Sequence, residues 1–188
     1  SARRASITEM LLRTDYCGAV DEDLALVLAR RGLSRCEELV PVLHTNFGLF
    51  PARFPSHYRN VQFELLVNSL CTDKRVKASR TQTDPISPCH ICGKGEDSIR
   101  HIFGGECEPV VLARKAVSKH IAYYDGKESF PDLDTDTLEA ADFWSASLLA
   151  FPRPGRDLQA KTRKAAVQAM ALFNGVVWLE RAYYFRLH

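Results

Sequence analysis

Three cysteines and one histidine within 19 residues constrain this chain more than any other feature, in the pattern Cys89-x2-Cys92-x8-His101-x5-Cys107. A Cys-x2-Cys pair offers two thiolates from one tight turn. The second pair adds an imidazole and a third thiolate, which completes the four-ligand tetrahedron that zinc prefers. Such a turn requires positive φ directly after its second cysteine, and Gly93 holds that position. The spacing therefore predicts a zinc site.

We expect this zinc to be structural, because four protein ligands close the coordination sphere, whereas a catalytic zinc keeps one position for water. Asp97 and Ser98 are suited to cap a short helical turn that carries His101. Cys107 is expected at the start of the next helix, where the helix dipole favours a thiolate. The metal would then join two distinct local structures.

Other interpretations of these residues remain open. The cysteines could be free thiols in a core, or a redox Cys-x2-Cys, although that motif usually opens a helix after a strand and neither flank has this pattern. His90 is a spare ligand inside the turn, and we expect it to face solvent or a phosphate. Cys17, Cys36 and Cys71 are most simply buried small apolar residues. Clustering of half the cysteines beside a histidine favours an intracellular metal site over an extracellular disulfide framework.

Helical periodicity dominates the rest of the chain and predicts an all-α fold, an irregular bundle of six to eight helices with the zinc knuckle inserted mid-chain. We expect one compact domain in three parts: helical residues 1–71, a basic loop and metal site over 72–107, and helical residues 108–188. The chain is 46% hydrophobic and 26% charged, as is usual for globular proteins. No apolar run approaches the roughly 20 residues needed to span a bilayer.

Helix boundaries follow from capping and breaking residues. The helical segments that we expect are residues 6–16, 21–31, 34–41, 56–72, 109–124, 136–151 and 158–186. Residues 44–55 hold three Phe, two Pro and one Gly, which predicts an ordered loop pinned by its aromatic residues. Residues 72–88 are basic and polar and end in two prolines, which predicts a second loop.

The last expected helix carries two adjacent apolar stripes, so we expect it to be central to the fold. One stripe holds Ala165, Ala169, Leu172, Val176, Leu179 and Tyr183, and the other holds Ala166, Met170, Phe173 and Val177. Gly175 costs about 1 kcal/mol relative to Ala inside a helix, and a close crossing with another helix would explain its presence.

The metal-site run PCHICGKGEDSIRHIFGGECEPV resembles the zinc-binding domain at the C-terminal end of non-LTR (LINE-like) retrotransposon reverse transcriptases. The resemblance covers about 25 residues and is carried by Cys89, Cys92, Gly93, Glu96, Asp97, Ser98, His101, Ile102, Phe103 and Cys107. The upstream basic run and the late helix with Trp178, Tyr183 and Tyr184 are also similar to that family. Retroviral knuckles use the shorter spacing C-x2-C-x4-H-x4-C and match less well.

This resemblance implies an intracellular, nuclear domain downstream of a polymerase, which helps to hold template RNA or target DNA and performs no catalysis itself. The polymerase's paired aspartates are absent from this sequence, and because the chain starts at Ser1 we interpret it as a piece of a longer protein. Some such elements carry a restriction-like endonuclease with a Pro-Asp motif. Pro131 and Asp132 match those two letters, but a helical pattern follows and no D/E-x-K does.

Basic residues next to the metal site are candidate phosphate contacts, because a rigid metal turn preorganises the charges beside it. The candidates are Lys74, Arg75, Lys77, Arg80 and Arg100. The alternative is a solvated loop that only keeps the protein soluble. A second basic cluster opposes the dipole at the start of the final helix, which favours a nucleic-acid partner; it comprises Arg153, Arg156, Lys161, Arg163 and Lys164. The net charge of +2 adds little to either prediction.

Phe47, Phe50, Phe54 and Tyr58 could stack on single-stranded bases, but pinning of the long loop to the core is the favoured interpretation. No Ser/His/Asp grouping, P-loop or dinucleotide fingerprint is present, so we expect no enzyme activity. The favoured function is a nucleic-acid-binding accessory domain of a retroelement reverse transcriptase. The rival is a zinc-stabilised protein-interaction domain, domesticated from such an element.

Overall fold

Helices make up the regular structure of the described residues, which are 26, 28–30, 36–67, 69–79, 85–124, 126, 133, 140–151 and 159–187 of the computed structural model. The helices are α3 (Cys36–Gly48), α4 (Ser56–Leu66), α5 (Asp73–Ser79), α6 (Ile99–Phe103), α7 (Glu108–Tyr124), α8 (Ala140–Ser147) and α9 (Ala160–Leu187). Within this part of the chain the extended pairing is a single bridge between Pro88 and Glu96. The all-α prediction is confirmed, with seven helices here. The expected helix over 6–16 and most of that over 21–31 lie outside the described residues.

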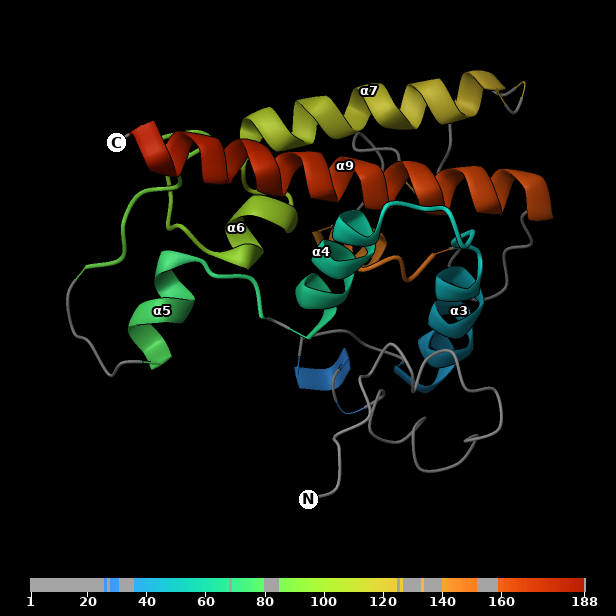
Figure 1. Ribbon diagram of the computed structural model, residues 1–188, viewed down its shortest axis with the longest axis horizontal. Coiled ribbons are helices and arrows are strands. Elements are labelled where there is room, and N and C mark those ends of the chain that lie inside the picture. Colours follow the sequence, from blue (N-terminus) through green and yellow to red (C-terminus); the bar gives the residue numbers. More distant parts are fainter. Residues whose placement is uncertain are drawn as a thin grey trace.

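The longest helix, α9, is the centre of the arrangement, as its wide apolar pattern predicted. It packs against α4, α7 and α3, and Figure 1 shows α7 alongside it on one side with α3 and α4 on the other. Ala166, Met170, Phe173 and Val177 are its buried stripe. Because α3 and α4 precede the metal site in sequence and α7 follows it, α9 holds both parts of the chain together.

Gly175 permits the close contact between α9 and α4. A methyl group at Gly175 would overlap the ring of Tyr58 on α4, and Gly175 is itself buried. The expected close helix crossing is therefore confirmed. The helix-propensity cost of the glycine is offset by packing that no larger residue would allow.

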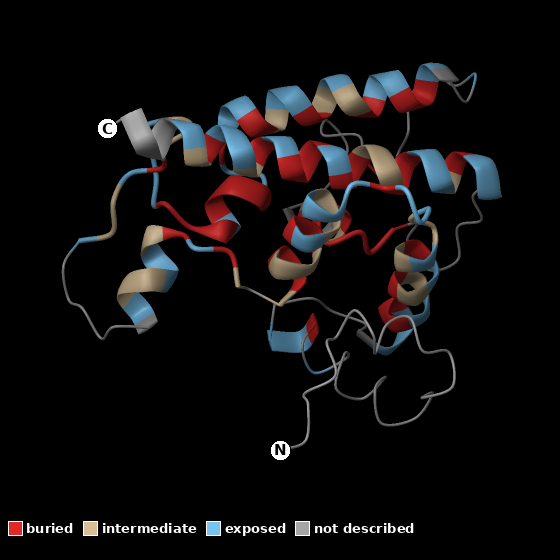
Figure 2. Cartoon of the chain, in the orientation of Figure 1, coloured by how far each residue is buried: buried red, intermediate tan, exposed pale blue. Residues whose placement is uncertain are grey.

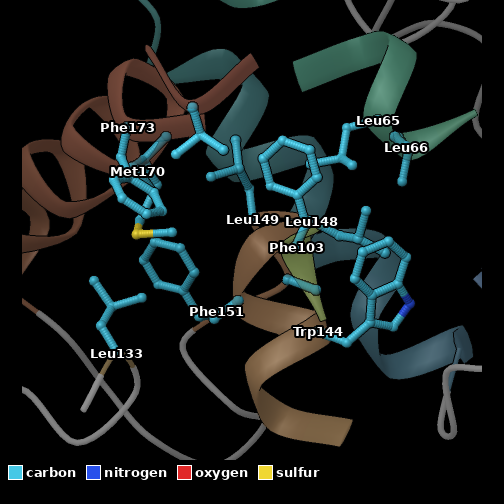
Figure 3. Packing of buried hydrophobic residues seen from close by; sticks show 14 of the residues in the cluster. Leu65, Leu66, Phe103, Leu133, Trp144, Leu148, Leu149, Phe151, Met170 and Phe173 are labelled. Carbon is cyan, nitrogen blue, oxygen red and sulfur yellow. The ribbon is translucent and has the colours of Figure 1, made fainter. Parts of the chain in front are cut away.

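The core extends from α9 to the short helices α6 and α8 and the chain that follows α8. Figure 3 shows its largest members, including Phe103 of α6, Trp144 of α8, Phe151 and Met170. Asn46 of α3 is buried within this region, and its side-chain amide donates to the carbonyls of Leu149 (2.6 Å) and Phe151. This amide ties α3 to the chain after α8 and satisfies carbonyls that would otherwise be buried without a donor.

The second apolar stripe of α9 faces solvent. Its members Leu172, Val176, Leu179 and Tyr183, which we call the apolar row, are 38%, 46%, 51% and 59% exposed. Figure 2 shows exposed positions along α9 between the buried ones. The two stripes thus separate into one that packs into the core and one whose larger side chains are exposed.

The helix expected to end near Pro41 instead runs through it. α3 includes Pro41 and continues to Gly48, so residues 44–48 are helical and not part of a loop. Proline at this position removes only the hydrogen bond to the carbonyl of Glu37, near the start of the helix. Beyond it, Leu43 and Asn46 are fully buried, and this burial holds the helix together.

The segment after α4 also differs from the prediction. α4 ends at Leu66 and not near residue 72, and residues 73–79 form α5 where we expected a loop. The N–H of Asp73 donates to the carboxylate of Asp97 (2.7 Å), and the N–H of Lys74 donates to the Asp97 carbonyl (3.1 Å). The Thr72 hydroxyl also accepts the Arg75 N–H (3.4 Å). Helix α5 is therefore capped both locally and by a residue 24 positions away, and no local pattern shows the second cap.

Candidate metal centre

The four predicted ligands converge. One ligand atom from each of Cys89, Cys92, His101 and Cys107 lies within 4.8 Å of all the others. The Sγ atoms of Cys89 and Cys107 are 4.0 Å apart, and Sγ of Cys92 is 3.2 Å from Nε2 of His101. Cys92 is half-buried and the other three are buried. These residues could bind a metal ion.

A tight turn presents the first two ligands. The N–H of Gly93 donates to the carbonyl of Cys89 (2.8 Å), and the N–H of Lys94 donates to Sγ of Cys92 (3.3 Å). Gly93 has a φ of +67°, as the sequence predicted. The hydrogen bond from the Cys89 N–H to the Gly95 carbonyl (3.1 Å) closes this turn. We call residues 85–107, which contain the turn, the metal-site loop.

Gly95 is a functional residue that the sequence analysis missed. Its φ is +63°, and a Cβ at this position would lie 2.6 Å from both Cε1 and Nδ1 of His101. The backbone conformation and the close approach to the imidazole both require glycine. The available signal was the second glycine, two residues after the one that the turn itself needs.

His101 is oriented by local contacts. The Ser98 hydroxyl caps α6 by accepting a hydrogen bond from the His101 N–H (3.1 Å), as predicted. Nδ1 of His101 lies 3.4 Å from a carboxylate oxygen of Glu106, while Nε2 faces Cys92. A carboxylate that accepts the Nδ1 proton leaves the Nε2 lone pair available to a metal. The role of Glu106 was not predicted.

Cys107 lies directly before α7, and its carbonyl accepts the N–H groups of Val110 and Val111 at 3.0 Å. The hydrogen bond between the two thiol groups lowers the pKa of Cys89 and raises the pKa of Cys107. Metal ligation requires both cysteines as thiolates, so binding would release their protons.

Asp97 does not cap α6, contrary to the prediction, because its carboxylate is fully buried and occupied elsewhere. It accepts the N–H of Asp73 and both Nε (2.8 Å) and Nη2 of Arg181. The metal-site loop is thereby joined to α5 on one side and to α9 on the other.

The predicted phosphate contacts lie around the metal-site loop. Lys74, Arg75 and Lys77 lie on α5, and we call them the α5 basic surface. Nζ of Lys74 pairs with Glu96 at 2.5 Å, with both side chains 53% exposed. Arg75 is exposed.

The remaining predicted contacts differ in their surroundings. Nζ of Lys77 pairs with Asp73 at 3.0 Å and donates to the Pro85 carbonyl, so it is engaged within the chain. Arg100 is exposed, with its guanidinium 5.2 Å from the centre of the Trp144 ring. Arg80 lies outside the described residues.

The second basic cluster does not present all its charges to solvent. Nε of Arg163 donates to the side chain of Asn46 (2.7 Å), and burial lowers the pKa of Arg163. Lys161 and Lys164 are exposed at the start of α9. Arg153 and Arg156 lie outside the described residues.

The aromatic residues around the turn after α3 pack on one another and on the core. Ring centres are 5.8 Å apart for Phe47 and Phe50, 4.9 Å for Phe50 and Phe54, and 6.3 Å for Phe54 and Tyr58. Phe54 is buried, and Phe47 and Phe50 are partly buried against the core. This packing agrees with the pinning interpretation.

Several other candidates can now be placed. Cys71 is exposed, so its predicted burial was wrong; it lies in the extended chain before α5. His90 is half-buried and is not in the ligand group. Cys17, Pro131 and Asp132 lie outside the described residues.

No helix in the described ranges is both long and apolar enough to span a bilayer. No protein-family model, curated protein or solved structure matches this chain.

Proposed function

We propose that this chain is a nucleic-acid-binding accessory domain with a structural zinc, from the C-terminal region of a retroelement reverse transcriptase. The convergence of three thiols and one imidazole on a common centre is the observation that carries the proposal. The other parts of the proposal rest on the resemblance of the metal-site run to the retroelement family. These parts are the parent reverse transcriptase, the nuclear location and a role without catalysis of its own.

Zinc fits this ligand set. With Zn–S near 2.3 Å and Zn–N near 2.0–2.1 Å, tetrahedral ligands lie roughly 3.5–3.8 Å apart. The separations of 4.0 Å for the Cys89 and Cys107 sulfurs and 3.2 Å between Cys92 and His101 bracket that range. Thiolates with an imidazole are ligands that zinc favours. Four protein ligands leave no position for water, which supports a structural role.

Nucleic-acid binding is supported by cations next to this centre. Lys74 and Arg75 on α5, Lys94 in the turn and Arg100 on α6 are all exposed. Side chains held near a fixed backbone lose little freedom when they contact phosphates. The proposed ligand is RNA or DNA, bound as template or target through its backbone.

A salt titration tests the proposal. Fluorescence anisotropy with single- and double-stranded RNA and DNA oligonucleotides should show binding that weakens steeply as salt rises. Arg75→Glu should weaken binding. It should also make the plot of log affinity against log salt concentration less steep, by about the slope of one phosphate contact. Lys119→Glu, an exposed position on α7, is the matched control. Absence of binding to every probe at low salt would refute this function.

The rival function, a zinc-stabilised protein-interaction domain, is favoured by one observation. The apolar row on α9 exposes four large side chains along one face, and exposed apolar surface of this kind marks sites of protein association. Association through such a face should persist at high salt. Leu179→Lys should abolish it and leave any oligonucleotide binding unchanged.

A further inference from the structure

Asp97 connects three segments that are far apart in the sequence. It lies in the metal-site loop between Cys92 and His101, and its side chain contacts both the start of α5 and the C-terminal half of α9. Its carboxylate is fully buried, so every oxygen lone pair must find a donor within the protein.

The contact with α5 is part of a closed ring of hydrogen bonds. The Asp97 carboxylate accepts the Asp73 N–H (2.7 Å), the Asp73 carboxylate accepts the Ser87 N–H (2.6 Å), and the Ser87 carbonyl accepts the Asp97 N–H (2.8 Å). Three segments thus hold one another in place. A seven-residue helix is too short to be stable alone, so α5 depends on this ring and on its cap.

The contact with α9 is a buried ion pair. Arg181 donates through Nε and Nη2 to the two carboxylate oxygens, with only 6% of its side chain exposed. Its guanidinium also lies 4.7 Å from the centre of the Trp178 ring. A buried pair of this kind requires both partners at fixed positions.

We propose that Asp97 is a positioning residue that couples metal binding to the order of α5 and of the C-terminal half of α9. Apart from the buried residues of the five-residue helix α6, the metal-site loop has one isolated bridge as its regular structure, so we expect its order to depend on the metal. Asp97 transmits that order to the α5 basic surface. The inference rests on the metal of the proposed function and is independent of nucleic acid.

Amide hydrogen exchange on the full chain tests the coupling. Removing zinc with a chelator should speed exchange in residues 73–79 and in the last turns of α9 by at least tenfold, with α4 protected. Zinc-loaded Asp97→Ala, which removes the side-chain acceptor of the Asp73 N–H and of Arg181, should show the same fast exchange in both segments. Its cobalt-substituted form should keep the thiolate-to-metal absorption of the wild type, because the four ligands remain. Glu96→Gln removes only the exposed ion pair with Lys74 on α5; because exposed pairs contribute little to stability, this control should leave α5 protected.

A second pair of variants separates the two contacts. Arg181→Gln should speed exchange in α9 only, because the cap of α5 is kept, and Arg181→Lys should restore much of the protection. Asp97→Ala combined with Arg181→Gln removes the cap and leaves no unpaired buried charge, so the fold persists while α5 still exchanges fast.

Two results would overturn the proposal. One is full protection of α5 in zinc-loaded Asp97→Ala or in the double variant. The other is an altered cobalt spectrum in these variants, which would make Asp97 a part of the metal site. Coupling without oligonucleotide binding would refute only the nucleic-acid function, and a wild-type chain that binds no metal would refute both.

Discussion

The metal-site loop and the helices around α9 are held together by different forces. Around α9 the residues are large and apolar, and burial of side chains such as Met170, Phe173 and Trp144 removes them from water. The metal-site loop shares in this core mainly through α6, whose Ile102 and Phe103 are buried, and otherwise has polar contacts: a ring of hydrogen bonds through Asp97, glycines with positive φ and four converging candidate ligand atoms. The helices around α9 should therefore stay folded when a chelator removes the metal, whereas the metal-site loop should lose its order.

The largest expected effect separates the two regions directly. Cys107→Ser removes one ligand, and because metal binding in such sites contributes on the order of 10 kcal/mol to folding, the metal-site loop and α5 should unfold. Amide exchange in residues 73–107 should become fast, with α4 and the middle of α9 still protected. Cys71→Ser changes an exposed cysteine outside the ligand group and should have no effect. An unchanged melting curve for Cys107→Ser would contradict a structural role for the metal.

The next effect acts on the helical core alone. Gly175→Leu should lower the free energy of unfolding by about 3 kcal/mol, because the new side chain overlaps the Tyr58 ring. Denaturant titration measures the loss, and zinc content should be unchanged. Tyr58→Ala should recover part of the stability when combined with it. Gly48→Ala, where no atom lies within 4 Å of the added Cβ, is the control.

A matched pair of glycines sharpens the comparison within the loop. Gly93→Ala should weaken zinc binding by about 1 kcal/mol through backbone strain alone, since no atom lies within 4 Å of the added Cβ. Gly95→Ala has the same backbone strain, and its Cβ also overlaps the His101 ring. Its loss of zinc-binding free energy should therefore be about 2–3 kcal/mol larger. Competition with a chromogenic chelator measures both zinc affinities. Equal losses in the two variants would show that the His101 contact is unimportant.

The smallest effect concerns a contact that crosses between the two regions. Arg100→Gln removes the guanidinium from the Trp144 ring and should lower stability by about 0.5–1 kcal/mol. Arg75→Gln on the exposed side of α5 should change stability by less. The comparison is made by denaturant titration in high salt, which screens general charge effects. Equal changes in the free energy of unfolding for the two variants would show that the contact between Arg100 and Trp144 does not contribute to stability.

Local patterns were sufficient to predict some elements. The convergence of the four candidate ligands, the Ser98 cap and the positive φ of Gly93 are each specified by residues near one another in the sequence. α7 and α9 were predicted because their apolar residues repeat over many turns. The glycine at position 175 predicted a close helix contact, although not that Tyr58 would supply it.

The errors share a physical cause, because each depends on contacts between distant residues. α3 continues through Pro41 since Leu43 and Asn46 are buried by other helices. α5 is capped by Asp97 from 24 residues away as well as by the adjacent Thr72 hydroxyl, and only the second of these caps is local. The apolar pattern of α9 likewise could not show which of its two stripes would be covered. Sequence periodicity shows that a face is apolar, but only the fold shows what lies against it.

The central claim is most directly tested by measuring the metal content of the purified chain. Inductively coupled plasma mass spectrometry, combined with native mass spectrometry, should find one zinc ion per chain in the wild type. Almost none should remain in Cys107→Ser or His101→Ala, while Cys71→Ser should match the wild type. A wild-type chain without bound zinc, or zinc that persists after either ligand is replaced, would contradict the account.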